Sequence, residues 1–478
     1  MFQELELQLD QPLQSQIYRF ISQGIIEQRL LSATRLPSSR QLAGQLRISR
    51  NTVNAAYEQL RVEGFIVSRA GSGWYVNTGR SEDRIDNLRM LRQSTAEVPQ
   101  QSKLAERLNE PKPSKDKFNL PFTPGLPDLS CFPLKQWNRL CRQNESRTAL
   151  MGYGDPQGQP ELREQIATYL RESRGVFCQP EQILVTQGAQ QALNVVFSLL
   201  LDPGDTVLIE EPGYRGTMKA AQMTDAVLQP VPVNEDGLKV SSLPPNTQAK
   251  LLYCTPTHQY PLGGILDVSE RLQLLEWSKR NQLWIVEDDY DSEFHFYQKP
   301  FPAMHSLVEQ ASVIYLGSFS KTLFPALRTG YLVLPESLMP AAVAIKEYMQ
   351  GNSPLLNQAV LAQFMADGHF KRHLRRMRYI YQQKWELLLQ QWQQQGNHQL
   401  LKPVVQSAGM HIVLTGEVDE GTLQQKLAAH GFGCTPLSYY FLNPPWLSGL
   451  VLGYANASES DIRALVQLLN ENTTSIPC

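Results

Sequence analysis

The sequence predicts a two-domain protein in which a small helical domain with a two-stranded hairpin precedes a large α/β domain with a mostly parallel sheet. The chain has 478 residues, more than one hydrophobic core usually organises. Near the N-terminus, apolar residues recur at helical spacing; from residue 118 onward, strand-like apolar runs alternate with helical patterns. We therefore predict domains at residues 1–78 and 118–478, joined by a linker at residues 79–117.

The composition is that of an ordinary soluble protein, with 42% hydrophobic and 19% charged residues. The longest apolar run, residues 195–201, is too short to span a membrane, and the N-terminus lacks the pattern of a secretory signal. Six scattered cysteines argue against a disulfide framework or a zinc site. We expect a cytoplasmic protein with no membrane partner and no metal.

The first domain is basic although the whole chain carries a net charge of −2. Residues 1–80 contain nine arginines and no lysine against six acidic residues. Residues 35–69 hold six of those arginines and only two glutamates. This asymmetry predicts one small basic face.

Three helices and a hairpin are expected in the first domain. Residues 12–26 have the apolar spacing of an amphipathic helix, and Ser38 and Ser49 can cap two further helices. In the third helix, Arg50, Asn51 and Asn54 point away from the apolar face and suit contacts with bases and phosphates. Residues 64–76 read as two short strands around a glycine-rich tip, which is a wing.

Two helices in a tight turn followed by a wing form a DNA-binding arrangement; a small helical bundle with a polar surface is the alternative. Residues 36–43, 49–53 and 56–66 resemble the winged helix-turn-helix of GntR-type bacterial regulators. The resemblance covers about the first eighty residues. It implies that a set of polar and glycine residues approaches double-stranded DNA: Arg35, Ser39, Arg40, Ser49, Arg50, Asn51 and Thr52, with Gly71 and Gly73 at the wing tip.

The linker is rich in charge, Gln, Ser and Pro, and it cannot bury enough apolar surface to order itself fully. We interpret it as a tether between domains. Residues 85–92 could form a short helix, and residues 103–108 could dock on the large domain.

Five strand-like runs in the large domain each end where polar candidate residues begin: residues 182–186, 206–210, 250–255, 283–287 and 313–316. Ligands of open α/β sheets bind beyond the carboxyl ends of the strands, so we expect one shared site. The last run leads to Lys321, which such a site can desolvate and make nucleophilic. Ser318, Ser320 and Arg328 suggest that its electrophile is an aldehyde with a phosphate, and pyridoxal 5′-phosphate fits; a solvated surface lysine is the alternative.

The other runs supply further candidates. A helix that starts near Gly188 would offer free amides to a phosphate through Gly188, Ala189 and Gln190. Tyr214 could stack on a heterocycle or simply pack on its own loop. The acidic residues 287–293 could hold a pyridine nitrogen protonated, while a solvated acidic loop or a divalent-cation site remains open.

Together these features resemble the fold-type-I aminotransferases, and the whole chain is similar to the MocR-type subfamily of GntR regulators. The resemblance implies that Lys321 binds the aldehyde of pyridoxal 5′-phosphate, that Asp288 meets the pyridine nitrogen and that Tyr290 meets the ring hydroxyl. It also implies that Tyr214 stacks on the ring, and that one further set surrounds the phosphate: Gly188, Ala189, Gln190, Ser318, Ser320 and Arg328. Tyr153 matches a tyrosine lent to the neighbouring subunit's phosphate site, which implies a homodimer.

Two positions depart from the aminotransferase pattern. Tyr260 stands where those enzymes have an asparagine, so the contact with the ring hydroxyl changes, and His258 is a candidate substitute. Residues 449–455 contain no arginine, although amino-acid aminotransferases carry one in this region for the substrate carboxylate.

We therefore expect a DNA-binding transcription regulator that depends on pyridoxal 5′-phosphate and senses it or its adduct with an amine or amino acid. Transaminase activity should be absent or weak. The alternatives are an active aminotransferase with an accessory DNA-binding head, and a DNA-binding protein with an empty large domain.

Overall fold

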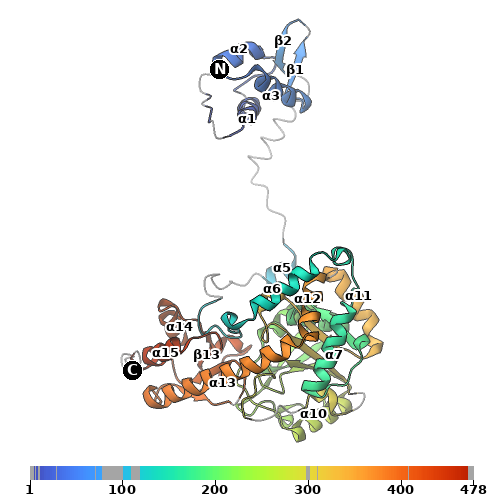
Figure 1. Ribbon diagram of the computed structural model, residues 1–478, viewed down its shortest axis with the longest axis vertical. Helices are drawn as coiled ribbons and strands as arrows, with labels where there is room; N and C mark the ends of the chain where they lie inside the picture. Colours follow the sequence, from blue (N-terminus) through green and yellow to red (C-terminus); the bar gives the residue numbers. More distant parts are fainter. Residues whose placement is uncertain are drawn as a thin grey trace. The chain divides into compact units, whose positions relative to one another are not determined.

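The computed structural model describes two compact units, Met1–Gln101 and Ser102–Cys478 (Figure 1). The described residues are 5, 7–8, 11–27, 29–69, 71–77, 101–108, 119–297, 302–308, 311–351, 353–406 and 408–471. No described helix is long and apolar enough to cross a bilayer.

The first unit contains the three helices and the hairpin that the sequence predicts. The helices are α1 (Leu13–Ile26), α2 (Ser39–Leu46) and α3 (Arg50–Val62), and the strands are β1 (Ile66–Arg69) and β2 (Gly73–Val76). Ser38 and Gln41 form a capping box at the start of α2, and the Ser49 hydroxyl accepts the Asn51 N–H at 3.1 Å at the start of α3. Both predicted caps are confirmed.

The core of this unit holds the wing against the helices. Apolar side chains from all five elements are fully buried: Ile17, Ile21, Leu42, Val53, Leu60, Ile66 and Val76. The Tyr57 hydroxyl donates to the Pro37 carbonyl at 2.9 Å, and the Trp74 ring lies edge-on to Tyr57 with centroids 5.7 Å apart. The buried side chain of Tyr57 on α3 thus contacts both the segment before α2 and the wing.

Residues 103–108 dock on the large unit, as predicted. Helix α5 (Lys103–Arg107) packs against α9 (Arg215–Thr224), and Arg107 forms an ion pair with Asp225. The predicted helix at residues 85–92 lies outside the described residues.

The large unit is built on a seven-stranded sheet in the order β3-β9-β8-β7-β6-β4-β5. Its strands are β3 (Ile183–Thr186), β4 (Thr206–Glu211), β5 (Val227–Pro232), β6 (Leu251–Cys254), β7 (Trp284–Asp289), β8 (Val313–Ser318) and β9 (Gly330–Val333). Strand β9 pairs antiparallel with both neighbours, and every other pairing is parallel. The five predicted strands are confirmed as β3, β4, β6, β7 and β8.

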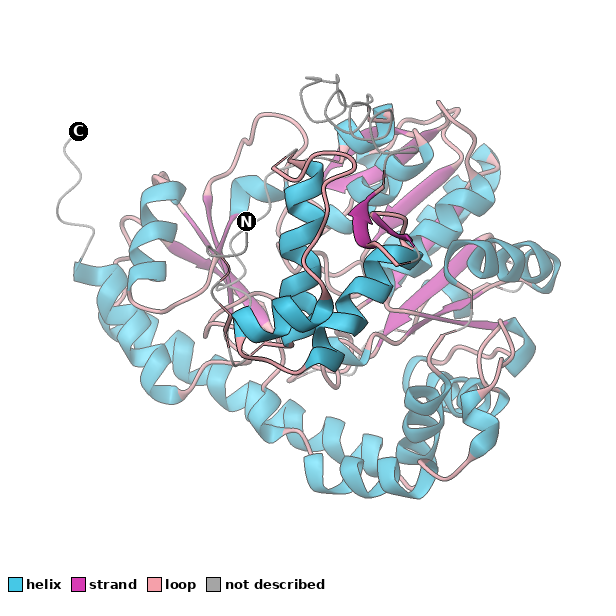
Figure 2. Ribbon diagram, turned by 90° about the horizontal axis from the view of Figure 1, so that it is seen from above, coloured by secondary structure: helices cyan, strands magenta, loops and turns pink. Residues whose placement is uncertain are grey.

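Helices cover both faces of this sheet (Figure 2). Along β8, Ile314 and Leu316 pack in the core with α8 (Ala189–Leu200), α9 and α11 (Met339–Gln350), while Tyr315 points to the core on the other face. Both faces of β3, β4, β6, β7, β8 and β9 are buried because these strands lie between two layers of helices, whereas the edge strand β5 is partly exposed. Such strands read as continuous apolar runs, which is why the sequence revealed them.

The other face is covered by α7 (Pro160–Arg174), α10 (Val268–Asn281) and α12 (Leu355–Ala366), with α6 (Leu134–Asn144) against α12. The 27-residue helix α13 (His369–Gln395) then leads to a smaller antiparallel sheet (Figure 1). That sheet has the order β10-β11-β13-β12 and consists of β10 (Lys402–Val404), β11 (His411–Thr415), β12 (Thr435–Pro436) and β13 (Gly449–Gly453). Helices α14 (Glu420–Ala429) and α15 (Glu459–Glu471) accompany it.

Candidate cofactor site and DNA-binding surface

A cavity of about 230 Å³ opens beyond the carboxyl ends of β6, β7 and β8. Nine of the predicted cofactor residues line it: Ala189, Gln190, Tyr214, Asp288, Tyr290, Ser318, Ser320, Lys321 and Arg328. Four further lining residues were not assigned a cofactor contact from the sequence: Tyr253, Thr255, Tyr260 and Pro325. The strands thus gather residues that are more than a hundred positions apart in the chain.

Lys321 lies just after β8 with its side chain half-buried. Its Nζ donates to the Gly125 carbonyl at 2.9 Å. Burial lowers the pKa of Lys321, and the nearby carboxylates of Asp291 and Asp288 oppose that shift. A lower pKa leaves more of the amine neutral, which is the nucleophilic form.

Because Gly125 has no side chain, the amine of Lys321 has room beside it. A Cβ placed on Gly125 would lie 2.1 Å from the Lys321 Nζ, and the backbone of Gly125 has φ of +74°. The sequence offered only a local signal here, a Pro-Gly turn after Thr123, and nothing connected it with Lys321.

We expect Gly125→Ala to displace the Lys321 amine and to weaken covalent capture of pyridoxal 5′-phosphate at least tenfold. Both the clash and the left-handed backbone act against the variant. The rate at which visible absorbance develops on adding the cofactor measures the effect. Gly421→Ala is the control, because its Cβ meets nothing closer than 3.5 Å. Equal rates for Gly125→Ala and the wild type would contradict the assignment.

Asp288 has one satisfied and one unsatisfied oxygen. Its Oδ2 accepts the Tyr253 hydroxyl at 2.6 Å, whereas Oδ1 is buried without a hydrogen-bond partner among the described residues. Burial raises the pKa of Asp288 to about 7. A buried acceptor without a donor is costly, and a protonated pyridine nitrogen in the cavity would supply the donor. This orphaned oxygen shows that the site fits a pyridine ring.

The opposite end of the cavity suits a phosphate. Gly188, with φ of +85°, is the N-cap of α8, so the first amides of that helix are free to meet an anion. The Arg328 guanidinium lies 3.5 Å from the position of a Cβ on Gly188. The Ser318 hydroxyl accepts the Ser320 N–H at 3.2 Å. Amides, hydroxyls and one arginine therefore converge there.

Tyrosines form the remaining wall. The rings of Tyr214 and Tyr253 are stacked with centroids 6.5 Å apart, and the Tyr260 hydroxyl lies 2.9 Å from the Tyr440 hydroxyl. Burial raises the pKa of Tyr214 to about 12, so its phenol stays neutral. Tyr260, predicted to stand in place of an aminotransferase asparagine, is thus held by Tyr440 from the region of the smaller sheet.

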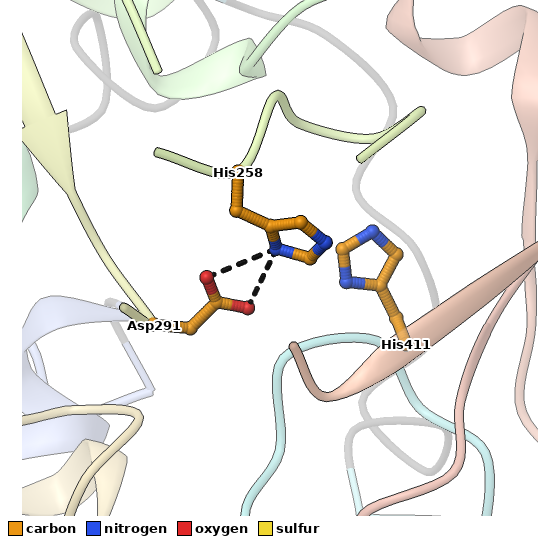
Figure 3. A group of neighbouring side chains, drawn as sticks. All are labelled: His258, Asp291 and His411. Atoms are coloured by element: carbon orange, nitrogen blue, oxygen red, sulfur yellow. Dashed lines mark hydrogen bonds and ion pairs between the residues drawn. The ribbon is translucent and has the colours of Figure 1, made fainter. Parts of the chain in front are cut away.

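His258 lies behind this wall, in a buried cluster with Asp291 and His411 (Figure 3). Its Nδ1 is 3.0 Å from Asp291 Oδ1 and 2.9 Å from the Tyr290 hydroxyl, and its Nε2 is 2.6 Å from Gln406 Oε1. Burial lowers the pKa of His258, but Asp291 outweighs it and the pKa is raised overall; burial lowers the pKa of His411 to about 3.

The three side chains could bring one ligand atom each within 4.8 Å of one another, which is compatible with a metal ion. Both nitrogens of His258 already have hydrogen-bond partners, so we interpret the group as a hydrogen-bonded cluster. His258 does not line the cavity, and its Nδ1 contacts the hydroxyl of Tyr290, which does.

Tyr153 is another predicted cofactor residue that does not line the cavity. Its side chain is 100% exposed, and Met151 beside it is 83% exposed. Such exposure suits a residue that serves a neighbouring subunit, which remains a prediction.

The predicted DNA-binding residues gather at the starts of α2 and α3. Arg40, Arg50 and Asn51 are exposed there, and Ser49 and Thr52 lie in the same first turn of α3. Ser39 is only 8% exposed, and its hydroxyl accepts from the Arg50 Nε at 3.3 Å. Ser39 is therefore placed to orient Arg50.

The wing adjoins these helices through Arg35. Arg35 forms an isolated β-bridge with Tyr75, and its guanidinium group lies 3.7 Å from the position of a Cβ on Gly73. Gly71 and Gly73 both have positive φ, at the tip of the β1–β2 hairpin. Arg69 covers the Tyr75 ring at 4.7 Å, so the exposed end of the wing is basic.

Comparison with known proteins finds two families, one for each compact unit of the chain. Residues 13–76 match the family of bacterial regulatory proteins of the gntR type, and residues 126–469 match the aminotransferase class I and II family. The protein therefore joins a GntR-type head to an aminotransferase-like domain.

Two regulators and one enzyme show this likeness. The chain is 36% identical to the probable rhizopine catabolism regulatory protein MocR of Rhizobium meliloti, covering 96% of this chain and 93% of that protein. It is 30% identical to the pyridoxine biosynthesis transcriptional regulator PdxR of Corynebacterium glutamicum, covering 94% and 93%. The α-aminoadipate aminotransferase LysN of Thermus thermophilus, solved with N-(5′-phosphopyridoxyl)-L-leucine, is 27% identical with a TM-score of 0.71, covering 78% and 96%.

The chain belongs to the MocR-type subfamily of GntR regulators. Its aminotransferase fold and the cofactor-bound neighbour support the predicted cofactor, pyridoxal 5′-phosphate.

Proposed function

We propose that this protein is a transcription regulator that binds double-stranded DNA and senses pyridoxal 5′-phosphate, or its adduct with an amine or amino acid. The observation that carries the proposal is the pairing, in one chain, of a GntR-type head with a cavity in which Lys321, Asp288 and Arg328 are all in place. The named regulators among its relatives have the same two parts over almost their whole length.

In this proposal the chain holds the cofactor at three points. Lys321 bonds the aldehyde, Asp288 accepts from the pyridine nitrogen, and Arg328 with the start of α8 binds the phosphate. Tyr214 stacks on the ring and Tyr290 meets its hydroxyl, backed by His258. When bound, the cofactor supplies an electron-withdrawing ring and an exchangeable bond to an amine.

Regulation requires the ligand to bind one arrangement of the protein more tightly than another. We propose a cytoplasmic homodimer in which Tyr153 of each subunit completes the phosphate site of the other, consistent with its full exposure. Two heads would then read two half-sites. We also propose the division into residues 1–78, 79–117 and 118–478, with residues 103–108 docked on the large domain.

An active aminotransferase is the second candidate, because the cavity contains the lysine, aspartate and arginine that the cofactor needs. Against it, β13 carries no arginine that could bind a substrate carboxylate, and Tyr260 replaces the usual asparagine. We therefore expect absent or weak transamination.

Footprinting of the protein's own upstream region, with and without pyridoxal 5′-phosphate and candidate amines, tests the proposal. We expect protection of two half-sites whose strength or extent changes with the ligand. Protection that is identical in every ligand condition, together with rapid turnover of a common amino acid and keto acid, would favour the enzyme.

Arg50→Ala should weaken binding to the same region by about 1–3 kcal/mol, which is roughly 5- to 150-fold, because an exposed arginine at the start of a recognition helix contacts bases or phosphates. Gel retardation at a fixed salt concentration measures this effect. Arg61→Ala is the control, since Arg61 lies at the other end of α3 and pairs with Glu58 at 2.8 Å. Equal losses in the two variants would exclude the assigned recognition surface.

A further inference from the structure

The first half of α13 concentrates positive charge on the surface of the large unit. Residues 369–381 contain one lysine, four arginines and no acidic residue. All five cations are exposed: Lys371, Arg372, Arg375, Arg376 and Arg378. The same turns bury His373, Leu374 and Met377 against the core, so the helix is held firmly with its cations outward.

Helix α6 extends this surface. Its exposed cations Lys135, Arg139 and Arg142 stand at positions i, i+4 and i+7, and the helix contains no acidic residue. The Arg139 guanidinium lies 3.3 Å from the His369 Nε2, which joins the two helices. We call these eight cations on α6 and α13 the basic ridge.

Two hollows flank α13 along the basic ridge. One, of about 440 Å³, lies between α7 and α13 and is lined by Lys371, Arg375 and Arg378. The other, of about 200 Å³, lies between α6 and α13 and is lined by Arg372 and Arg376. Cations on both sides of one helix can meet an extended anion from either flank.

Few internal partners neutralise the basic ridge. Lys371 pairs with Glu172 of α7 at 3.3 Å, and the Arg378 Nε donates to the Glu293 carbonyl at 2.8 Å. Across the described ranges of the chain, no ion pair joins Arg142, Arg375 or Arg376 to a carboxylate. These three arginines can therefore bind a ligand without breaking an ion pair within the described residues.

We propose that the basic ridge binds the backbone phosphates of DNA that flanks the sequence read by the winged head. Six of its eight cations are arginines, whose planar guanidinium groups suit phosphate oxygens. Lys371 to Arg378 spans about 10 Å of helix, a length over which duplex DNA presents roughly six phosphates. The match favours a polyanion of duplex charge density over a single small anion.

In this proposal, the head of the same chain supplies the DNA. Once the head holds its site, flanking phosphates are present at high effective concentration, so weak contacts suffice. The inference rests on the proposed DNA-binding function. It adds a second, sequence-independent contact that would contribute affinity without altering which bases are read.

The test compares two full-length variants that remove three positive charges each. The first is Arg142→Gln, Arg375→Gln and Arg376→Gln. The matched control neutralises three exposed lysines elsewhere on the large unit: Lys219→Gln, Lys279→Gln and Lys402→Gln. Each protein is titrated at several salt concentrations with a duplex limited to the footprinted sequence and with one extended on both sides.

On the extended duplex, the basic-ridge variant should lose at least tenfold in affinity, and its log–log salt slope should fall by about 2 to 3 units, since each lost phosphate contact contributes about 0.9. The short duplex should bind all three proteins equally, and the control should match the wild type on both.

An unchanged salt slope on the extended duplex would overturn the proposal, as would equal losses on the short and extended duplexes. Poly-glutamate serves as a second ligand that represents an acidic protein. If the basic-ridge variant lost binding to poly-glutamate but kept its affinity for DNA, the partner would be an acidic protein instead. If even the wild type fails to bind the short duplex, the proposed DNA-binding function fails, and that outcome is distinct from failure of the basic ridge.

Discussion

The Lys321→Ala variant should purify colourless and should gain no visible absorbance when pyridoxal 5′-phosphate is added. The amine of Lys321 is the predicted nucleophile at the carboxyl end of β8, its pKa is lowered by burial, and Lys321 lines the cavity together with Asp288 and Arg328. Loss of the covalent bond leaves only the phosphate and ring contacts. We expect retention of the cofactor on gel filtration to fall from nearly complete to nearly none.

The matched control is Lys346→Met, which removes another lysine whose pKa burial lowers, here to about 8. Lys346 lies on α11 and donates to the Pro156 carbonyl, outside the cavity. This variant should stay yellow. Borohydride reduction followed by peptide mapping locates the bond directly, and a pyridoxyl group on any lysine other than Lys321 would refute the assignment.

Replacing Asp288 with asparagine should have opposite effects on the cofactor-free and cofactor-bound protein. Because burial raises the pKa of Asp288 from 3.8 to about 7, the native state binds a proton that the unfolded chain releases near pH 4. The wild type without cofactor therefore loses stability as the pH rises from about 4 to about 7. Asparagine does not titrate. The free energy of unfolding of the variant, relative to that of the wild type, should therefore rise by roughly 2–3 kcal/mol from pH 5 to pH 8.

With the cofactor bound, the same substitution removes the negative partner of the pyridine nitrogen. Breaking such a buried pair costs about 3–5 kcal/mol, so the affinity for pyridoxal 5′-phosphate should fall at least a hundredfold. Urea denaturation of the cofactor-free proteins at several pH values measures the first effect, and absorbance titration measures the second. If the free energy of unfolding depended on pH in the same way for both proteins, Asp288 would be ionised in the native state without cofactor, and the prediction would be wrong.

The small unit and the main strands could be predicted because their signals are local. Ser38 and Ser49 cap helices within three residues of themselves, and the apolar runs of β7 and β8 are continuous because helices cover both faces of the sheet. The residues that follow these strands lie in one site because the carboxyl ends of parallel strands are at the same edge of the sheet.

Other features depend on contacts that no local pattern reveals. Gly125 contacts Lys321 across almost two hundred residues of sequence. The sequence indicates only that Tyr253 lies in a strand, whereas in the structure its hydroxyl donates to Asp288. The link between His258 and Gln406 joins a loop of the large sheet to the region of the smaller one. The basic ridge has no single local signal, because its cations come from α6 and α13, which lie more than two hundred residues apart in the sequence.

The hydrogen bond from Lys321 to Gly125 has a mechanical consequence. Three residues after Gly125, Asp128 forms a largely buried ion pair with Lys384 at 2.8 Å, and the Asp128 N–H donates to the Tyr381 hydroxyl at 3.0 Å; both partners belong to α13. One amine cannot serve the Gly125 carbonyl and a bound aldehyde alike. If Lys321 bonds the cofactor as proposed, the segment from Gly125 to Asp128 would lose its contact with Lys321 and keep its contacts with α13, the helix that carries the basic ridge.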